Sequence, residues 1–458
     1  MIENDAFKLL LINLFHLNPD DIANILCTTF NKMMVLLVTL TDKHQACPYC
    51  GFTAPKIKEY VTKEITHSAL TTQKCIIKYR ARRYKCPCCG KTYYEFNPFV
   101  FKSQKISILT VHNILKDLKD FNETFTSVAR RYHVSPTSVS TIFDNHVDIG
   151  RNPLPEIINF DEVYAFKSEK SKYVCVLLDF KKQIPVDVLP NRKKEYLLNY
   201  FQKIPLEERK KVKYACSDMY EVYRDVVHKV FPSCCMLLDY FHLSQDFHRK
   251  MNEVRIKVMK GYKDNKASDE YYLLKKFNWL LFKNPEDEDK YGRLFDVERE
   301  RKYNSHFKSY MNYYDLRKKL LEINNDLTIC YSLKLELVDF YSKSTIDNAK
   351  VNLENLIRSC IDTNIDEMIA FSNNLINWKQ EIINSFTIVG TEYKVEADKG
   401  QVVVCNKKVN NAIIENRNKI IKCIKNNANG YTNWPRFRNR VMYVLDPNAT
   451  FSLEPREK

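Results

Sequence analysis

Four cysteines in two short motifs have the spacing of metal ligands. CPYCG (Cys47 to Cys50) and CPCCG (Cys86 to Cys89) repeat one pattern, with 35 residues between them. Each such turn can aim two thiolates at one ion, so the pair predicts a tetrahedral zinc site of four sulfur ligands. Four thiolates leave no open coordination position, so we expect a structural zinc. The alternatives are free cysteines in tight turns, or Cys88 as a ligand in place of a neighbour.

Two aspartates in the middle of the chain are the best candidates for catalysis. Asp161 lies in the β-type run IINFDEVY, and Asp218 ends the run VKYACSDM. Two strand-like runs and a helical run separate them (residues 172–180, 184–189 and 194–202). Three strands, a helix and a further strand is the opening order of the ribonuclease-H-like fold, whose first and fourth strands are neighbours. The two carboxylates would then approach each other, although they are 57 residues apart.

Adjacent carboxylates without a basic partner are best explained by divalent metal ions. Two Mg²⁺ (or Mn²⁺) ions can activate an attacking oxygen and stabilise a leaving one, which is phosphodiester chemistry. The alternative for an Asp at the end of a strand is a turn residue. Glu162 and Asp179 are rival carboxylates, but Glu162 would point to the opposite face from Asp161 in a regular strand. A third carboxylate is expected from a downstream helix.

The elements before Asp161 predict contact with nucleic acid. The 35 residues between the cysteine motifs fit a hairpin of residues 57–65 with 74–83. Residues 75–105 carry eight Lys or Arg against one Glu, with tyrosines interleaved, which suits phosphate contact and base stacking. The alternative is a solvated ribbon face. The DNA-contact candidates here are Arg80, Arg82 and Arg83.

The run FTSVARRYHVSPTSVSTIF (residues 125–143) has the apolar spacing of a helix-turn-helix. Ser135 can cap the second helix and Pro136 can occupy its first position. His133 stands in the turn, where glycine is common, and residues 105–120 supply a preceding helix. The alternative is a helical hairpin that packs only internally. The second helix would present four hydroxyl side chains to a major groove: Thr137, Ser138, Ser140 and Thr141.

Composition restricts the class of protein. A length of 458 residues predicts about three domains. The net charge of +16 favours a polyanionic partner, and eight glycines without a glycine-rich phosphate loop argue against simple nucleotide-binding enzymes. No run reaches the roughly 18–20 apolar residues of a membrane span. Fifteen cysteines, an odd number, fit free thiols and metal ligands in a reducing compartment, so we expect a cytoplasmic protein.

The ordered set of motifs resembles the bacterial insertion-sequence transposases of the ISL3 family, in the DDE superfamily. The matching pieces are the cysteine knuckles, the helix-turn-helix, NFDEVYAFK, SDMYEVYRDVVHKVFP, LLDYFH and NNAIIENRNKIIKCIKNNANGYTNWPRFRNRVMYVL, across residues 40–445. The resemblance implies that Asp161 and Asp218 are the first two catalytic carboxylates and that Glu415 is the third. These three would also be the Mg²⁺ ligands.

The same resemblance implies supporting residues around the carboxylates. Asp239 and His242, in DYFH, match an Asp/Cys-x2-His element that such transposases carry, and would support the site or position DNA. The alternative is a strand-end Asp beside a packed His. Four residues spaced three or four apart share one helix face: Asn411, Glu415, Asn418 and Lys422. That face would offer a carboxylate to metal and Lys422 to phosphate.

The predicted architecture is multidomain, with α+β and α/β parts. It combines an N-terminal four-cysteine zinc ribbon, a helix-turn-helix and a ribonuclease-H-like catalytic domain with a large helical insertion. The insertion follows from the separation of the second and third carboxylates, which are 197 positions apart. The expected limits are 1–42 for a lead-in, 43–100 for the zinc ribbon, 103–150 for the helix-turn-helix, 156–245 and 401–445 for the two parts of the core, 246–400 for the insertion and 446–458 for a tail.

The resemblance implies a transposase that binds the terminal inverted repeats of an insertion sequence and catalyses metal-dependent strand cleavage and strand transfer. Its partners would be double-stranded DNA, as element ends and target, and further copies of itself, since two ends must be paired. We expect no membrane partner and a location at the bacterial nucleoid. Two alternatives stay open: a transposase-derived DNA-binding regulator without catalysis, and a structure-specific nuclease of the same fold.

Overall fold

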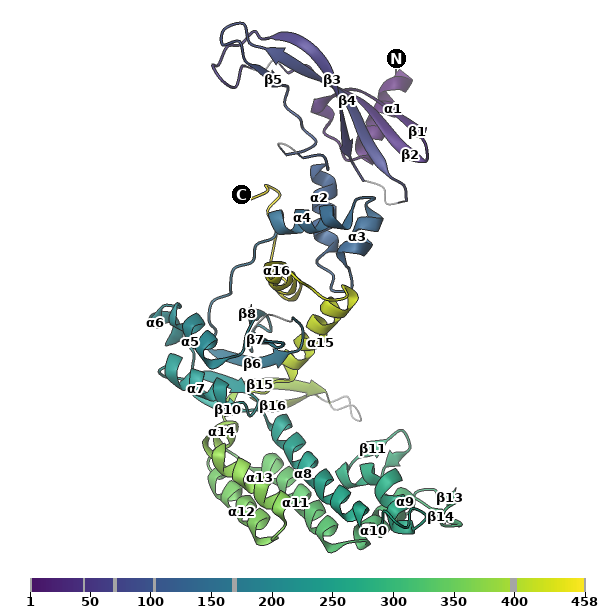
Figure 1. Ribbon diagram of the computed structural model, residues 1–458, viewed down its shortest axis with the longest axis vertical. Helices are drawn as coiled ribbons and strands as arrows, with labels where there is room; N and C mark the ends of the chain where they lie inside the picture. Colours follow the sequence, from purple (N-terminus) through teal and green to yellow (C-terminus); the bar gives the residue numbers. More distant parts are fainter. Residues whose placement is uncertain are drawn as a thin grey trace.

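The structure is a computed structural model that describes residues 2–43, 46–68, 72–101, 104–166, 171–395 and 402–456. The chain forms an elongated molecule (Figure 1). A first β-sheet lies at one end, a helical body lies at the other, and three short helices and a second sheet lie between them. The C-terminal helices return to this middle region, so it contains segments from distant parts of the sequence.

The first sheet contains the ribbon that carries the cysteine motifs. Helix α1 (Ile2–Leu14) packs on it, and the short helix η1 (Pro19–Asp21) leads into it. The strand order is β1-β2-β4-β3, with β5 beside β4. The pairing of β3 with β4 confirms the predicted hairpin. The strands are β1 (Ile22–Phe30), β2 (Met33–Leu40), β3 (Lys56–Thr66), β4 (Cys75–Lys85) and β5 (Thr92–Tyr94).

The lead-in expected over residues 1–42 contains α1 and, after it, two strands. Strands β1 and β2 form a hairpin, and its turn residues Asn31 and Lys32 both have positive φ, as two-residue hairpin turns require. Strand β2 then pairs in parallel with β4, with Leu36 opposite Ile77. A short apolar run such as residues 33–40 cannot be distinguished from a buried helix by periodicity alone. The expected limit at residue 42 therefore cuts through one sheet.

Three helices follow where the sequence predicts them: α2 (Ile108–Asp117), α3 (Phe125–Arg131) and α4 (Pro136–His146). The Ser135 side chain caps α4 by accepting a hydrogen bond from the Ser138 backbone N–H. His133 takes the left-handed conformation, with φ of 54°, in the turn before α4. The helices share one buried core. DNA contact by these helices stays a prediction.

The second sheet has the order β10-β9-β6-β7-β8. Strand β6 is antiparallel to β7 and β7 to β8, whereas β9 runs parallel to β6 and β10 parallel to β9. The first and fourth strands are therefore neighbours, as the sequence predicts. The strands are β6 (Ile157–Val163), β7 (Val174–Asp179), β8 (Pro185–Leu189), β9 (Tyr214–Ser217) and β10 (Cys235–Leu238).

Helices cover both faces of the second sheet. Helices α5 (Lys194–Gln202) and α7 (Glu221–Val230) pack on one face, and α6 (Leu206–Arg209) leads into β9. Helices α15 (Ala412–Asn427) and α16 (Trp434–Leu445) pack on the other (Figure 1). Because side chains alternate along a strand, successive residues of β6 point toward one or the other of these two helical layers.

The helical body lies between β10 and α15 in the chain and has its own hydrophobic core. The expected limit at 245/246 falls inside its first helix, and the limit at 400/401 separates β15 from its partner β16. Residues 396–401, at that second limit, lie outside the described residues.

The helices of this body are α8 (Tyr240–Lys260), α9 (Asp269–Lys276), η2 (Asn278–Phe282), α10 (Tyr313–Glu322), α11 (Asn325–Lys343), α12 (Ala349–Asp362), α13 (Asp366–Asn377) and α14 (Lys379–Asn384). The strands are β11 (Glu288–Asp289), β12 (Gly292–Arg293), β13 (Lys302–Asn304), β14 (Ser309–Met311), β15 (Ile388–Val395) and β16 (Val402–Lys408).

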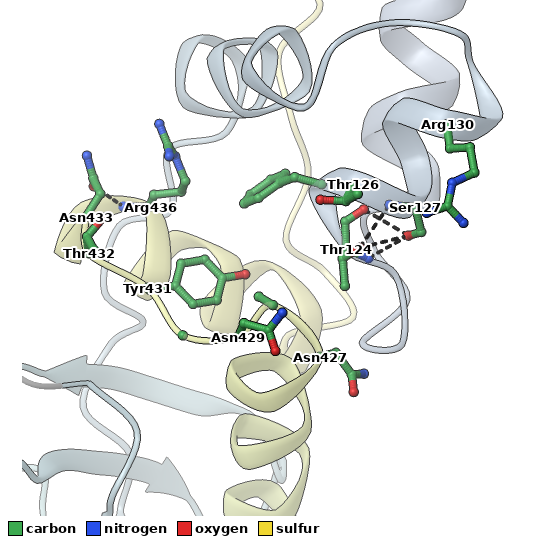
Figure 2. A pocket seen from close by; sticks show the side chains of 13 residues that line it. Thr124, Thr126, Ser127, Arg130, Asn427, Asn429, Tyr431, Thr432, Asn433 and Arg436 are labelled. Carbon is green, nitrogen blue, oxygen red and sulfur yellow. Dashed lines mark hydrogen bonds between the residues drawn. The ribbon is translucent and has the colours of Figure 1, made fainter.

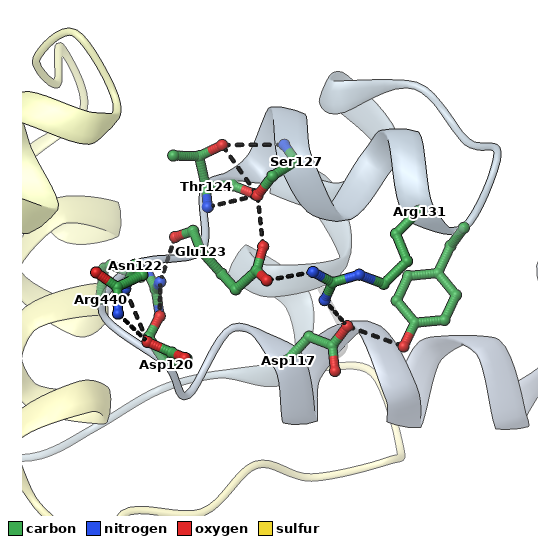
Figure 3. Close-up of polar contacts among 9 residues, drawn as sticks. Asp117, Asp120, Asn122, Glu123, Thr124, Ser127, Arg131 and Arg440 are labelled. Carbon is green, nitrogen blue, oxygen red and sulfur yellow. Dashed lines mark hydrogen bonds and ion pairs between the residues drawn. The ribbon is translucent and has the colours of Figure 1, made fainter. Parts of the chain in front are cut away.

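A buried joint connects α16 to the three short helices. Arg440 is 1% exposed, and its guanidinium donates to the backbone carbonyls of Asp120 and Glu123, at 2.8 and 2.7 Å. Figure 3 shows these contacts, and also the ion pair of the Glu123 carboxylate with Arg131. Tyr443 donates to the Leu115 carbonyl at 3.0 Å. The three helices are thus fixed to the segment that carries the third predicted carboxylate.

Candidate functional site

The structure brings together the four thiols that the motifs predict. The sulfur atoms of Cys47, Cys50, Cys86 and Cys89 all lie within 4.8 Å of one another, with separations of 3.7 Å for Cys47 to Cys89 and 3.5 Å for Cys50 to Cys86. Zn–S bonds of about 2.3 Å in a tetrahedron require sulfur separations of about 3.8 Å. Cys88 is exposed and lies outside the cluster. The cluster therefore fits one closed four-thiolate metal position.

Two matching turns shape this cluster. Gly51 and Gly90 follow the last cysteine of each motif and have φ of 75° and 71°, a conformation that glycine adopts without strain. Their N–H groups donate to the carbonyls of Cys47 and Cys86, at 2.8 and 2.9 Å. Backbone N–H groups, chiefly that of Cys89, also lower the pKa of the Cys86 thiol to about 7. Such donors favour the thiolate, which is the form that binds metal.

The two predicted aspartates lie at the ends of neighbouring parallel strands. Asn159 on β6 pairs with Cys216 on β9, and continuing this register by two residues brings Asp161 level with Asp218. Burial, with a contribution from Asp218, raises the pKa of Asp161 to about 7. Burial, followed by the charge of Glu162, raises the pKa of Asp218 to about 6. The buried Asp218 Oδ1 accepts no hydrogen bond from the described residues.

Asparagines connect Asp161 to helix α15. Asn418 donates its side-chain amide to Asp161 Oδ2 at 2.7 Å, and Asn159 donates to Asn411 Oδ1 at 2.7 Å. Glu415 lies between Asn411 and Asn418 on the same helix, so the helix face that was predicted does lie against β6. No role for these asparagines was predicted from the sequence. The available signal was the alternation of Asn159 and Asp161 on one strand face, opposite two asparagines seven residues apart on a helix.

Glu415 lies closest to the Asp239 and His242 pair. Asp239 precedes the first residue of α8, and His242 lies in the first turn of that helix. His242 Nε2 is 3.8 Å from Asp239 Oδ2 and 3.8 Å from Glu415 Oε1. Ligand atoms of these three residues all lie within 4.8 Å of one another. Asp218 and His242 also line one cleft, which connects this cluster to the pair of aspartates.

The rival carboxylates have structural partners. Glu162 points to the opposite face of β6, as expected, where it pairs with Arg192 and accepts a hydrogen bond from the Tyr223 hydroxyl at 3.3 Å. Asp179 accepts hydrogen bonds from the backbone N–H groups of Lys181 and Lys182, at 2.9 and 3.0 Å, and so stabilises a turn. Both carboxylates therefore stay outside the candidate site.

The predicted DNA contacts on β4 differ in exposure. The Arg82 side chain is 13% exposed, pairs with Glu95 at 2.7 Å and donates to the Leu40 carbonyl at 3.1 Å. Arg82 therefore connects parts of the first sheet, and its contact with DNA stays a prediction. Arg80 is exposed over the Tyr60 ring, and Arg83 pairs with Glu59 at 2.7 Å. Arg80 is the arginine best placed to meet a phosphate.

The hydroxyl side chains on α4 also separate into two groups. Thr137 and Thr141 are exposed, whereas Ser138 and Ser140 are half-buried. The Ser138 hydroxyl lies 2.8 Å from that of Ser135, and the Ser140 hydroxyl donates to the Thr137 carbonyl at 3.0 Å. The two threonines are therefore the freer pair. Lys422, the predicted phosphate contact on α15, is also exposed.

A polar hollow lies where α3 meets the turn between α15 and α16. Figure 2 shows Thr124 and Ser127 on one side, and Asn429 and Tyr431 on the other. Arg130 also lines the hollow. Helix α3 and the C-terminal end of α15 thus border one polar hollow.

The four-cysteine cluster and the carboxylate site are thus two separate candidate metal-binding sites. A family model described as a transposase, of the ISL3 group of DDE transposases, matches residues 158–397, which is more than half of the chain. The chain belongs to this transposase family, and its partner class is therefore DNA. The matched residues include Asp161, Asp218 and the Asp239 and His242 pair, and end before Glu415.

One relative extends the similarity along the chain. The transposase for insertion sequence element IS1001 of Bordetella parapertussis is 19% identical over 411 residues, which cover 89% of this chain and 91% of that protein. The similarity therefore includes the regions on both sides of the matched family model. No helix among the described residues is both long enough and apolar enough to cross a membrane.

Proposed function

We propose that the chain is a DDE transposase whose second sheet is a ribonuclease-H-like catalytic core. The strand order β10-β9-β6-β7-β8, with β9 parallel to β6, is the order of that fold. The observation that carries the proposal is the meeting of Asp161 and Asp218 at the ends of β6 and β9, below a helix that carries Glu415. These carboxylates come from distant segments, and only the fold brings them together.

The residues at this site fit divalent ions. Asp161, Asp218 and Glu415 would hold Mg²⁺ or Mn²⁺, because carboxylate oxygens are the ligands that such ions prefer. The buried Asp218 Oδ1 without a hydrogen-bond partner is an atom that a cation would satisfy. When bound, two such ions would promote ionisation of the attacking oxygen and stabilise charge on the leaving oxygen.

The protein's own residues would position DNA and the carboxylates. Asn418 donates to Asp161 Oδ2 and the Glu162 backbone N–H donates to Asp161 Oδ1, both at 2.7 Å, so these two hydrogen bonds fix the orientation of the carboxylate. In the first step a water oxygen bonds to phosphorus as the P–O3′ bond breaks, which frees a 3′-hydroxyl at the element end. In the second step that 3′-oxygen loses its proton and attacks a target phosphodiester, whose own 3′-oxygen leaves. No serine or tyrosine nucleophile is required.

End recognition would belong to the N-terminal regions. Helices α2 to α4 would act as a helix-turn-helix, with the exposed Thr137 and Thr141 facing a major groove. A zinc ion on the four cysteines would hold the ribbon that presents Arg80 and Arg83 to the phosphate backbone. The buried joint at Arg440 supports coupling of DNA recognition to catalysis, because it fixes these helices to the segment carrying Glu415. Two ends would be paired by a dimer or a larger assembly.

The test uses the purified protein, Mg²⁺ and DNA carrying the ends that flank this reading frame. Wild type should cleave and join these ends, and Glu415→Gln should bind them without cleaving or joining. Glu195→Gln, which removes an exposed carboxylate at the start of α5, is the matched control and should retain activity. Specific binding without cutting by wild type would favour the regulator. Cutting without preference for the ends would favour the nuclease.

A further inference from the structure

We propose that His242, Asp239 and Glu415 form a nitrogen-containing metal position beside the Asp161 and Asp218 pair, one that takes Mn²⁺ in preference to Mg²⁺. This inference rests on the proposed function, because Glu415 would be shared between the two halves of the site. It assigns His242 as a metal ligand rather than as a packed or DNA-positioning residue.

The geometry of His242 suits a ligand better than a hydrogen-bonded histidine. Its Nε2 is buried and has no hydrogen-bond partner among the described residues. The carboxylate oxygens of Asp239 and Glu415 are both 3.8 Å away, which is too long for a hydrogen bond. Two ligands about 2.1 Å from one ion can lie up to about 4.2 Å apart, so both separations fit a shared ion.

Three separate elements converge to make this arrangement. Asp239 directly follows β10, His242 lies on α8 and Glu415 lies on α15. Backbone N–H groups of Phe241 and Asn411 point at the Asp239 carboxylate, which connects the start of α8 to the start of α15. The position is therefore fixed by the junction of two helices with the sheet. Fixed helix starts are a more rigid support for ligands than an open loop.

The site is also accessible from solvent. A cleft beside it is lined by Asp218, Met219, His242, Gln245, Asp246 and Arg249. Asp246 in this cleft is already engaged, since it pairs with Arg249 and accepts a hydrogen bond from Asn374 at 2.8 Å. Asp218 Oδ1 and His242 Nε2 both lack hydrogen-bond partners in the described part of the chain. These two atoms, which could each bind a metal ion, thus belong to different halves of the site and line the same cleft.

The donor set determines the preferred ion. Mg²⁺ prefers oxygen ligands only and keeps several waters, whereas imidazole nitrogen suits transition metals. One imidazole with two carboxylates therefore favours Mn²⁺ over Mg²⁺ at this position. The pair of Asp161 and Asp218 has oxygen donors only and carries no such preference. One site would then contain two positions of different selectivity.

The test measures metal binding directly, on the full chain with zinc loaded and no DNA. Mn²⁺ is titrated into the protein and followed by electron paramagnetic resonance, with pulsed detection of directly bound ¹⁴N. Wild type should show the ¹⁴N signal, and a large excess of Mg²⁺ should displace this Mn²⁺ poorly. His242→Gln should lose the signal and bind Mn²⁺ at least about tenfold more weakly, and Asp239→Asn should also weaken binding. The matched control is His228→Gln, an exposed histidine on α7, which should match wild type.

The outcomes separate this inference from the proposed function. Wild type without a ¹⁴N signal, or His242→Gln with an unchanged one, would overturn the inference even if Asp161→Asn abolishes cleavage in Mg²⁺. A ¹⁴N signal that depends on His242, in a wild-type protein that cleaves no DNA, would support the metal position and contradict the proposed catalysis. Melting curves and zinc content of each variant report whether the fold is retained.

Discussion

The four-cysteine cluster and the carboxylate cleft are two metal-binding arrangements of opposite kinds. In the cluster, four like donors converge on one position and none is left over. In the cleft, donors of two kinds converge from five elements, and Asp218 and His242 each keep an atom without a hydrogen-bond partner among the described residues. Four protein ligands that fill every coordination position suit a structural ion. Ligand atoms with no other partner suit ions that must also bind a substrate.

The two arrangements also differ in how the chain builds them. The cysteines lie in two tight turns close to one hairpin, so local geometry fixes most of the cluster. The cleft joins Asp161 to Asn418 across 257 positions of sequence, so it exists only when the whole middle region is folded. Loss of a ligand should therefore unfold the first region but only inactivate the second.

The largest expected effect is on the cysteine cluster. Cys47→Ser should lose stoichiometric zinc and unfold the ribbon, because structural zinc contributes about 10–16 kcal/mol of apparent binding free energy to such small domains. Metal analysis and circular dichroism on the purified chain measure both changes. Cys88→Ser is the matched control and should keep one zinc per chain, since Cys88 lies outside the cluster. Retention of full zinc by Cys47→Ser would contradict a four-thiolate site.

The second prediction concerns the cleft, where the effect should fall on activity alone. Asp218→Asn should lower strand cleavage at least about 1,000-fold, which corresponds to about 4 kcal/mol of transition-state stabilisation. The melting temperature should not fall, because the change removes a buried charge that lacks a hydrogen-bond partner at Oδ1 in the described structure. Zinc content should equal that of wild type. Cleavage within tenfold of wild type would remove Asp218 from the catalytic set.

The same contrast explains what the sequence could and could not predict. The cysteine cluster follows from motif spacing, and α4 follows from Ser135 and Pro136, because these signals act within a few residues. The order of strands and helices around Asp161 and Asp218 was also predictable from alternating runs. Glu415 was reached only through family resemblance, since no local pattern connects it to β6.

Other features were missed for physical reasons. Strand β2 is a short apolar run, and the sequence of such a run fits a buried helix as well as a strand. The ion pair of Arg82 with Glu95, on a following segment, could not be predicted from the alternation of arginines and tyrosines there. The contact of Asn418 with Asp161 required the packing of α15 on β6. In each case a tertiary partner decided the outcome.

The third prediction tests whether Asn418 positions Asp161. Asn418→Ala should lower the rate of cleavage about 10- to 100-fold, or about 1.4–2.7 kcal/mol, with a smaller change in DNA affinity, because outer partners orient metal-binding carboxylates. Asn416→Ala, an exposed asparagine on the same helix, controls for loss of an amide from α15. Asn418→Asp should not rescue the rate, since a carboxylate cannot donate to Asp161. Equal rates for the two alanine variants would limit Asn418 to a packing role.

The smallest effect should appear on the ribbon that the cysteines support. Arg80 is exposed and so can meet a phosphate, and Arg80→Gln should weaken binding to element ends about two- to fivefold and reduce the slope of log affinity against log salt by about 1. Lys203→Gln, an exposed charge at the end of α5, should leave that slope unchanged. Cleavage of DNA already bound should be the same in both variants.

A slope change combined with normal cleavage would establish that the cysteine region contributes to holding DNA, whereas the carboxylate cleft carries out the reaction. An unchanged slope for Arg80→Gln would instead restrict DNA contact to the three helices and the cleft.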